Sequence, residues 1–161
     1  MPSYCDFEMK VTGSKNNVRE FLNVLKRKDC DEPHFQRIIE ASVYKEETLE
    51  NSSYAAYIEG CCAWSVHTCM LNGEGTYNND IEDEEQTITL ESESEKLGIN
   101  IEVWSKETSL GFAEHYIYQS GEEVLNECFS CEYTSEETDE DTDLDKEFYK
   151  NIDTDWGVWY A

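Results

Sequence analysis

Apolar and polar residues alternate over the first predicted element, residues 4–11. The apolar members are Cys5, Phe7, Met9 and Val11. A period of two is the pattern of a half-buried strand. Gly13 and Ser14 interrupt it, and the next apolar residues recur at i, i+3, i+4 and i+7, as Val18, Phe21, Leu22 and Leu25. This second pattern predicts a helix of about three turns, with Ser14 or Asn16 as its N-cap.

Two more strands and a short helix are predicted in the middle of the chain. Residues 35–44 (FQRIIEASVY) are rich in β-branched and aromatic residues and continue into the polar residues 45–47. Residues 54–62 form a similar segment, so both are predicted to be strands. Thr89 can cap a helix over residues 90–97 that Gly98 ends, although the alternation in TITLESE also fits a strand.

Three strands follow at short spacing, at residues 99–104, 112–119 and 124–133. Ser120-Gly121-Glu122 is predicted to form a hairpin turn between the last two. The expected order is β-α-β-β-α-β-β or close to it. The fold class is therefore α+β, an antiparallel sheet with helices packed on one face.

The last part of the chain has a different composition. After Tyr133 no apolar residue occurs before Leu144, which favours a solvated linker or loop. The aromatic end is expected to dock back on the domain; its residues are Phe148, Tyr149, Trp156, Trp159 and Tyr160. We therefore divide the chain into an α+β domain, residues 1–133, and an acidic and aromatic extension, residues 134–161.

Charge adds information that the hydrophobic pattern lacks. The 161 residues include 37 Asp and Glu against 12 Lys and Arg, a formal net charge of -25. Residues 1–50 carry -2 of this charge and residues 51–161 carry -23. Two blocks concentrate the acid: residues 80–85, continuing to Glu91, Glu93 and Glu95, and residues 132–147. Binding phosphates requires a basic surface, so we do not expect direct binding of nucleic acid.

The cysteines and the lengths of the apolar runs indicate in which compartment of the cell the protein is found. Seven cysteines form an odd set without the regular spacing of a secreted disulfide framework: Cys5, Cys30, Cys61, Cys62, Cys69, Cys128 and Cys131. The first residues lack the basic and apolar blocks of a signal peptide, and nowhere do 18 apolar residues run together. We expect a cytoplasmic protein without a membrane segment, whose thiols are reduced and mostly buried.

Three separated segments carry a family resemblance. They are CDFEMKVTGS with the helix VREFLNVL, the central GCCAWSV at residues 60–66, and GFAEHYI at residues 111–117, followed by a hairpin and Glu127-Cys128. Together they resemble the YubB-type ferredoxin-like family of conjugative plasmids and phages, over residues 4 to 133. The resemblance implies a ferredoxin-like α+β fold and an origin on a mobile element of a bacterial host. It implies no catalytic residues.

The sequence contains only incomplete metal-binding motifs. Cys128 and Cys131 form one CxxC pair, but a structural zinc ion normally needs a second pair at matching spacing. Asp139, Asp141, Asp143 and Asp145 match positions 1, 3, 5 and 7 of an EF-hand loop. The loop then has Leu144 where it needs Gly and Lys150 where it needs a bidentate Glu. We expect no metal and no cofactor.

Catalytic motifs are also lacking. The sequence has no Walker loop, Rossmann glycine set, nucleophile elbow or HExxH. His67 or His115 beside carboxylates could serve a metal-dependent hydrolase, although their spacing does not support one. Lone histidines on strands are commonly packing or surface residues. We therefore expect a protein that is not an enzyme.

The charge and the family resemblance together favour an inhibitor. A rigid array of carboxylates can imitate the phosphates of DNA or RNA and occupy the basic groove of a nucleic-acid-binding protein. The expected target is a CRISPR–Cas effector or another defence nuclease, which would make the chain an anti-CRISPR protein. The predicted partner-binding carboxylates are Asp80, Glu82, Asp83, Glu84, Glu85, Glu136, Glu137, Asp139, Glu140, Asp141 and Asp143, and the predicted aromatic anchors are Trp156 and Trp159.

Two alternatives remain open from the sequence. The chain could be a small plasmid or phage regulatory module that binds a protein partner through an uncharged face, in which case its affinity would depend little on salt. It could also be a metal-dependent enzyme with dispersed ligands. The acidity itself also fits an ordinary acidic cytoplasmic protein.

Overall fold

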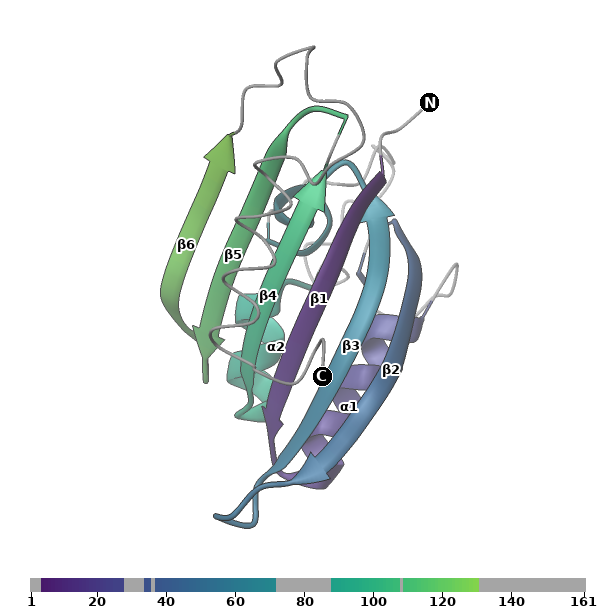
Figure 1. Ribbon diagram of the computed structural model, residues 1–161. Coiled ribbons are helices and arrows are strands. Elements are labelled where there is room, and N and C mark those ends of the chain that lie inside the picture. Colours follow the sequence, from purple (N-terminus) through teal and green to yellow (C-terminus); the bar gives the residue numbers. More distant parts are fainter. Residues whose placement is uncertain (1–3, 28–33, 36, 72–87, 108, 131–161) are drawn as a thin grey trace, which may run out of the picture.

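A computed structural model describes residues 4–27, 34–35, 37–71, 88–107 and 109–130. Within these residues one antiparallel sheet has the strand order β2-β3-β1-β4-β5-β6 (Figure 1). In chain order the elements are β1 (Tyr4–Gly13), α1 (Lys15–Lys26), β2 (Ile38–Thr48), β3 (Tyr54–Ala63), the π-helix η1 (His67–Leu71), α2 (Leu90–Leu97), β4 (Asn100–Glu107), β5 (Phe112–Gln119) and β6 (Glu122–Ser130). The α+β class is confirmed.

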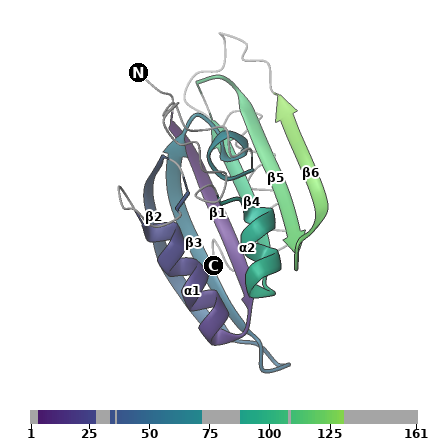
Figure 2. The ribbon, with the colours of Figure 1, turned by 180° about the vertical axis from the view of Figure 1, so that it is seen from behind.

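The core lies between the sheet and the two α-helices. Both helices cover the same face, as the view from behind shows (Figure 2). Strand β1 is central, and its residues Cys5, Phe7, Met9 and Val11 are all buried in this core. The period-two prediction for β1 is confirmed, because each apolar side chain of the alternation points to the helices.

Both α-helices begin at a predicted N-cap, and α2 also ends where the sequence predicts. The hydroxyl of Ser14 accepts a hydrogen bond from the backbone N–H of Asn17 and caps α1, whose apolar residues face the sheet. Thr89 caps α2 in a reciprocal capping box with Ser92, and Gly98 ends it with a φ of 60°. The strand alternative for TITLESE is wrong, because its residues 90–93 belong to α2.

Three details differ from the sequence prediction. Strand β2 begins at Ile38 instead of residue 35, because Arg37 has a φ of 56° and breaks the extended backbone. The π-helix η1 was not predicted, since one turn of helix is too short for a periodic pattern. The bounds of two later strands also differ, because β4 continues to Glu107 and β6 already begins at Glu122, although all three strands after α2 were predicted.

The edges of the sheet are β2 and β6. Strand β2 has register shifts at Ile38/Glu40 and Val43/Lys45, which interrupt its row of backbone groups. Strand β6 carries exposed carboxylates at Glu122, Glu123 and Glu127. Among the helices of the described ranges, none has the length and apolar character that crossing a membrane requires.

Candidate functional site

The predicted partner-binding residues lie outside the described residues. This holds for the first acidic block at 80–85, for the carboxylates at 136–143, and for Trp156 and Trp159. It also holds for the incomplete EF-hand pattern at 139–150 and for Cys131 of the CxxC pair. What the structure describes is the framework to which these segments are attached.

The described residues next to the two acidic blocks lie at the same end of the sheet. The first block follows η1, which comes directly after the end of β3 at Ala63. The second block follows the end of β6 at Ser130. The register pairs Ala63 with Tyr4 on β1 and pairs Ser130 with Phe112 on β5, and both pairs are at the upper end of the sheet in Figure 1. The last described residues before each acidic block therefore lie at one end of the sheet.

One buried carboxylate fixes this end. Glu114 on β5 is 1% exposed and faces the core. Its Oε1 accepts hydrogen bonds from the backbone N–H of Val66 at 2.9 Å and from the hydroxyl of Ser105 at 2.7 Å. Its Oε2 accepts from the backbone N–H of His67 at 3.0 Å and from the Tyr116 hydroxyl. Glu114 thus ties the start of η1 to β4 and β5.

The donors around Glu114 explain why a charged group is tolerated there. The first N–H groups of a helix have no hydrogen-bond acceptor within the helix. A carboxylate placed there accepts their hydrogen bonds, and these bonds compensate the carboxylate for its loss of water. The thiol of Cys5 adds a longer contact of 3.8 Å to Oε1. Burial and the neighbouring Glu114 carboxyl raise the pKa of the Tyr116 hydroxyl, so Tyr116 remains a hydrogen-bond donor at neutral pH.

Sequence reasoning missed Glu114, although a signal was present. The FAEHYIYQ segment of β5 alternates, and Glu114 shares the face of Phe112, Tyr116 and Tyr118. A carboxylate in the apolar phase of a strand indicates a buried, hydrogen-bonded group. The prediction had considered only His115 from this segment as a candidate for chemistry.

His115 is a packing residue on the opposite face of the sheet. Its ring stacks on that of Trp104, with centroids 3.5 Å apart, and its Nε2 lies 2.7 Å from Oε2 of Glu102. His67 is exposed at the start of η1. Within the described part of the chain, no three His, Cys, Asp or Glu residues are grouped so that they could hold a metal ion.

The described cysteines are free thiols. Cys5, Cys62 and Cys69 are buried, Cys61 is half-buried and Cys128 is exposed. Burial is the first cause that raises the pKa of the Cys61 and Cys128 thiols, which lowers their reactivity. For these five residues the prediction of reduced, mostly buried thiols agrees with the structure.

Charge is unevenly distributed over the described residues. Seven of their nine Lys and Arg residues precede residue 50: Lys10, Lys15, Arg19, Lys26, Arg27, Arg37 and Lys45. The part from 88 to 130 has nine carboxylates and only two lysines, Lys96 and Lys106. Five of these carboxylates are exposed on α2 and β6: Glu91, Glu95, Glu122, Glu123 and Glu127. The half of the sheet that leads to the second block is itself acidic.

Glu93 does not belong to the solvated acidic surface that the sequence predicted. It is buried because Leu90, Glu93, Ser94 and Leu97 share the inner face of α2. Burial raises the pKa of its carboxyl group. Only Glu91 and Glu95 of this helix add to the acidic surface.

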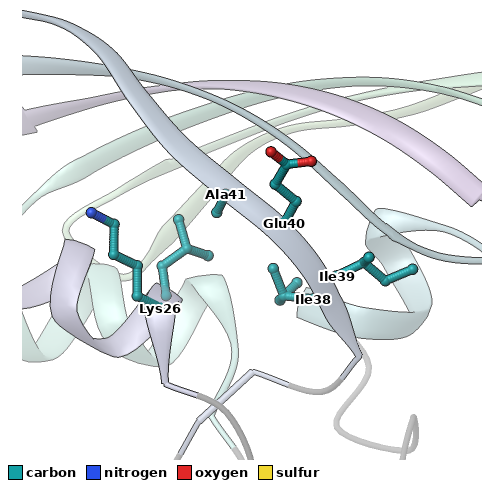
Figure 3. Close-up of a pocket in the computed structure, with 6 residues that line it drawn as sticks. Lys26, Ile38, Ile39, Glu40 and Ala41 are labelled. Atoms are coloured by element: carbon teal, nitrogen blue, oxygen red, sulfur yellow. The ribbon is translucent and has the colours of Figure 1, made fainter.

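A shallow apolar pocket of about 370 Å³ lies at the basic side of the molecule, between the end of α1 and the start of β2 (Figure 3). Leu25, Ile38, Ile39 and Ala41 provide its apolar lining, and Lys26 and Glu40 complete it. Ile39 is exposed, and the carboxylate of Glu40 points away from the helix. This is a largely apolar surface on an edge strand, with one lysine and one carboxylate at its border, and it is well separated along the sheet from the acidic half.

Comparison with known proteins adds no relative. No family model matches the chain, no curated protein matches it, and no solved structure matches it. The resemblance to the YubB-type family therefore depends on the three sequence segments alone.

Proposed function

We propose that this chain is a non-catalytic acidic inhibitor that competes with DNA or RNA for the basic groove of a nucleic-acid-binding protein. The observation that carries the proposal is that the described residues preceding the two acidic blocks lie at the same end of the sheet. Residues 80–85 contain five carboxylates and residues 132–147 contain nine, against one lysine. We infer that two such blocks, attached to the same end of the sheet, act on a partner as one anionic surface.

A nucleic acid presents the same kind of surface. Double-stranded DNA carries about one negative charge per 1.7 Å of its axis, and proteins bind it largely by neutralising those phosphates. Exposed carboxylates on α2 and β6 make this half of the sheet acidic as well, although Glu95, Glu122 and Glu123 lie at the end opposite to Ser130. Complementary charge speeds the encounter with a basic partner and excludes acidic ones. Trp156 and Trp159, the aromatic anchors expected from the sequence, would add apolar contact with the partner only where they are not packed against the chain's own sheet.

The class of target follows from the family resemblance. We infer a YubB-type ferredoxin-like domain, and the strand order β2-β3-β1-β4, with a helix after β1 and another before β4, supports that inference. Proteins of plasmids and phages meet the defence nucleases of their hosts. We therefore propose a CRISPR–Cas effector or another defence nuclease in the bacterial cytoplasm as the target, which makes the chain an anti-CRISPR protein.

The test uses the full chain and charge reversal. A tagged protein is first used to capture a nuclease from a lysate that expresses CRISPR–Cas and other defence systems. The affinity for that purified nuclease is then measured across a salt series and with competing nucleic acid. Reversing four carboxylates of either block to Lys should weaken binding at least tenfold and flatten its dependence on salt.

A matched control reverses four exposed carboxylates on α1, β2 and the turn after β2: Glu20→Lys, Glu40→Lys, Glu46→Lys and Glu50→Lys. This variant has the same change in net charge but leaves both acidic blocks intact, so its affinity should fall less. Binding that survives reversal of both blocks, or that competing nucleic acid does not reduce, would rule out mimicry.

A second candidate function is a regulatory module that binds a protein through an uncharged face. The pocket beside β2 favours it, because Ile39 is exposed there over an apolar lining. In that case Ile39→Lys would abolish capture of the partner, and the affinity would be nearly independent of salt. Charge reversal in the acidic blocks would then have little effect.

A further inference from the structure

The face of the sheet opposite the helices has an unexpectedly buried centre. Strand register places Glu8, Trp104 and His115 next to each other on this face, on β1, β4 and β5. Both described α-helices lie on the other side (Figures 1 and 2). Nevertheless Trp104 is only 2% exposed and His115 only 6% exposed.

Neighbouring strands do not account for this burial. Strands are about 4.8 Å apart, so a side chain on one strand covers only the sides of the side chains on the next strand. The tip of each side chain stays open to solvent unless a second layer of structure covers the sheet. Ala113, also on this face, is 1% exposed although its short side chain leaves room above it. Loss of solvent also raises the pKa of the Glu8 carboxyl to about 8, with the adjacent Glu59 as a second cause. No helix or strand of the described ranges lies over this face.

We propose that the aromatic end of the chain, residues 148–160, packs on this face over Trp104 and His115. The segment supplies five aromatic side chains: Phe148, Tyr149, Trp156, Trp159 and Tyr160. Aromatic rings pack favourably on one another and bury a large apolar area each. The segment that we place on this face is thus aromatic, like the stacked Trp104 and His115 rings that it would cover.

Charge and length favour this segment over the rest of the extension. Residues 148–160 carry only Lys150, Asp153 and Asp155, whereas residues 132–147 would bring nine carboxylates onto a face that already carries Glu59 and Glu102 and has Lys10 and Lys106 to balance them. Strand β4 is two strands from β6, or roughly 10 Å. The 17 residues from 131 to 147 can span on the order of 55 Å, so the aromatic segment reaches the site easily.

Docking has a consequence for the second acidic block. With one end fixed at Ser130 on β6 and the other held on the sheet, residues 132–147 form a closed loop instead of a free tail. A closed loop has fewer conformations than a free tail. Its carboxylates therefore lose less conformational entropy when they become ordered on a partner. This consequence depends on the proposed function, whereas the docking itself can be tested without any target.

The experiment uses the full chain labelled with 5-fluorotryptophan. Its four ¹⁹F signals are assigned by single Trp→Phe substitutions, and the solvent exposure of each indole is measured from the shift between H₂O and D₂O. In the unmodified chain the Trp104 signal should show no solvent shift. In the variant with Trp156→Ser, Trp159→Ser and Tyr160→Ser, that signal should acquire the shift of an exposed indole.

The control changes the same extension without touching its aromatic residues. Glu136→Gln, Glu137→Gln and Asp139→Asn should leave the Trp104 signal unchanged. A second measurement needs no variant: the unmodified chain should give nuclear Overhauser contacts between the Trp104 indole and the rings of Trp156, Trp159 or Tyr160. Absence of those contacts, an exposed Trp104 in the unmodified chain, or a buried Trp104 in the triple Ser variant would each overturn the proposal.

Dilution separates this proposal from a second copy of the chain. If Trp104 becomes exposed on dilution while sedimentation shows a dimer dissociating, a second copy covers the face and our proposal is wrong. If Trp104 is covered by the aromatic segment but charge reversal in the acidic blocks leaves target binding unchanged, the docking stands and the proposed function fails.

Discussion

At the scale of single residues, two glutamates on opposite faces of the sheet have different environments. Glu114 on β5 is buried in the core and accepts several hydrogen bonds, two of them from the first N–H groups at η1. Glu8 on β1 is half-buried beside Glu59, and its Oε2 is a buried oxygen for which no hydrogen-bond donor occurs among the described residues. Removing Glu114 is therefore expected to destabilise the protein, whereas neutralising Glu8 should stabilise it.

Glu114→Ala should lower the free energy of unfolding by about 3 kcal/mol or more, because several buried donors lose their acceptor at once. Urea denaturation of the two proteins measures the difference. Glu127→Ala is the matched control, since Glu127 is exposed on the neighbouring strand, and it should change stability by less than about 0.5 kcal/mol. Equal effects of the two substitutions would show that Glu114 is not the anchor of η1.

The raised pKa of Glu8 predicts a specific dependence on pH. The folded state holds the Glu8 proton up to a pKa of about 8, whereas the unfolded state releases it near the ordinary value of 4.5. Between these values the folded protein binds more protons, so this group's contribution to stability decreases as the pH rises. Glu8→Gln should abolish that contribution.

The expected gain for Glu8→Gln is about 1 kcal/mol at pH 8.5, a value reduced for the partial exposure of the group, and near zero at pH 4.5. Thermal unfolding across this range measures it. Glu59→Gln should produce part of the same effect, because it removes the neighbouring negative charge. A stability difference that does not change with pH would contradict the assignment.

At the scale of elements, close packing between strands limits the size of the side chain at one position of β3, and the sequence pattern does not reveal this limit. Gly60 lies on the core face of β3, opposite Phe7 on β1. A Cβ atom at Gly60 would be 2.3 Å from the carbonyl oxygen of Glu40 and 2.4 Å from Cζ of Phe7. The backbone of β2 and a core ring therefore both require glycine here, within the GCCAWSV segment.

Gly60→Ala should lower stability by about 3 kcal/mol, at the upper end of overpacking effects, because the backbone of β2 cannot move freely. Gly98→Ala provides the comparison. No atom lies within 4 Å of a Cβ there, so its cost of about 1 kcal/mol comes only from the φ of 60°. Adding Phe7→Leu should recover part of the loss at Gly60 but none at Gly98. Denaturant unfolding of the two Ala variants, each with and without Phe7→Leu, tests this. Equal losses for the two Ala variants would contradict it.

At the scale of the whole molecule, a net charge of -25 repels itself and opposes folding. Salt screens this repulsion, because the Debye length falls from about 30 Å at 0.01 M to about 8 Å at 0.15 M. The exposed carboxylates on α2 and β6 lie in the half of the sheet that leads to the second acidic block, so the repulsion is concentrated there.

The melting temperature should therefore rise by several degrees between 0.01 M and 0.3 M NaCl. A variant with Asp80→Asn, Glu82→Gln, Asp83→Asn, Glu84→Gln and Glu85→Gln should show a smaller rise, because it starts with less repulsion. Circular dichroism melts measure both. A melting temperature that is independent of salt would mean that the acidic blocks are too far from the folded part to affect it.

The sequence by itself determined the elements and the position of the acid along the chain. Period-two alternation predicted β1, helical spacing predicted α1, the hairpin turn at residues 120–122 separated β5 from β6, and Thr89 and Gly98 predicted both ends of α2. These predictions succeed because they depend on residues within one element, where backbone geometry fixes which side chains share a face. The two acidic blocks are likewise a property of the sequence.

Only the tertiary structure decided which of these features meet. Pairing of strands distant in sequence brings the ends of β3 and β6 to one end of the sheet, and it places Glu114 of β5 against η1. The same pairing brings Trp104 and His115 together on the face opposite the helices. Local patterns carry no information on such contacts, because register and strand order depend on how the whole core packs.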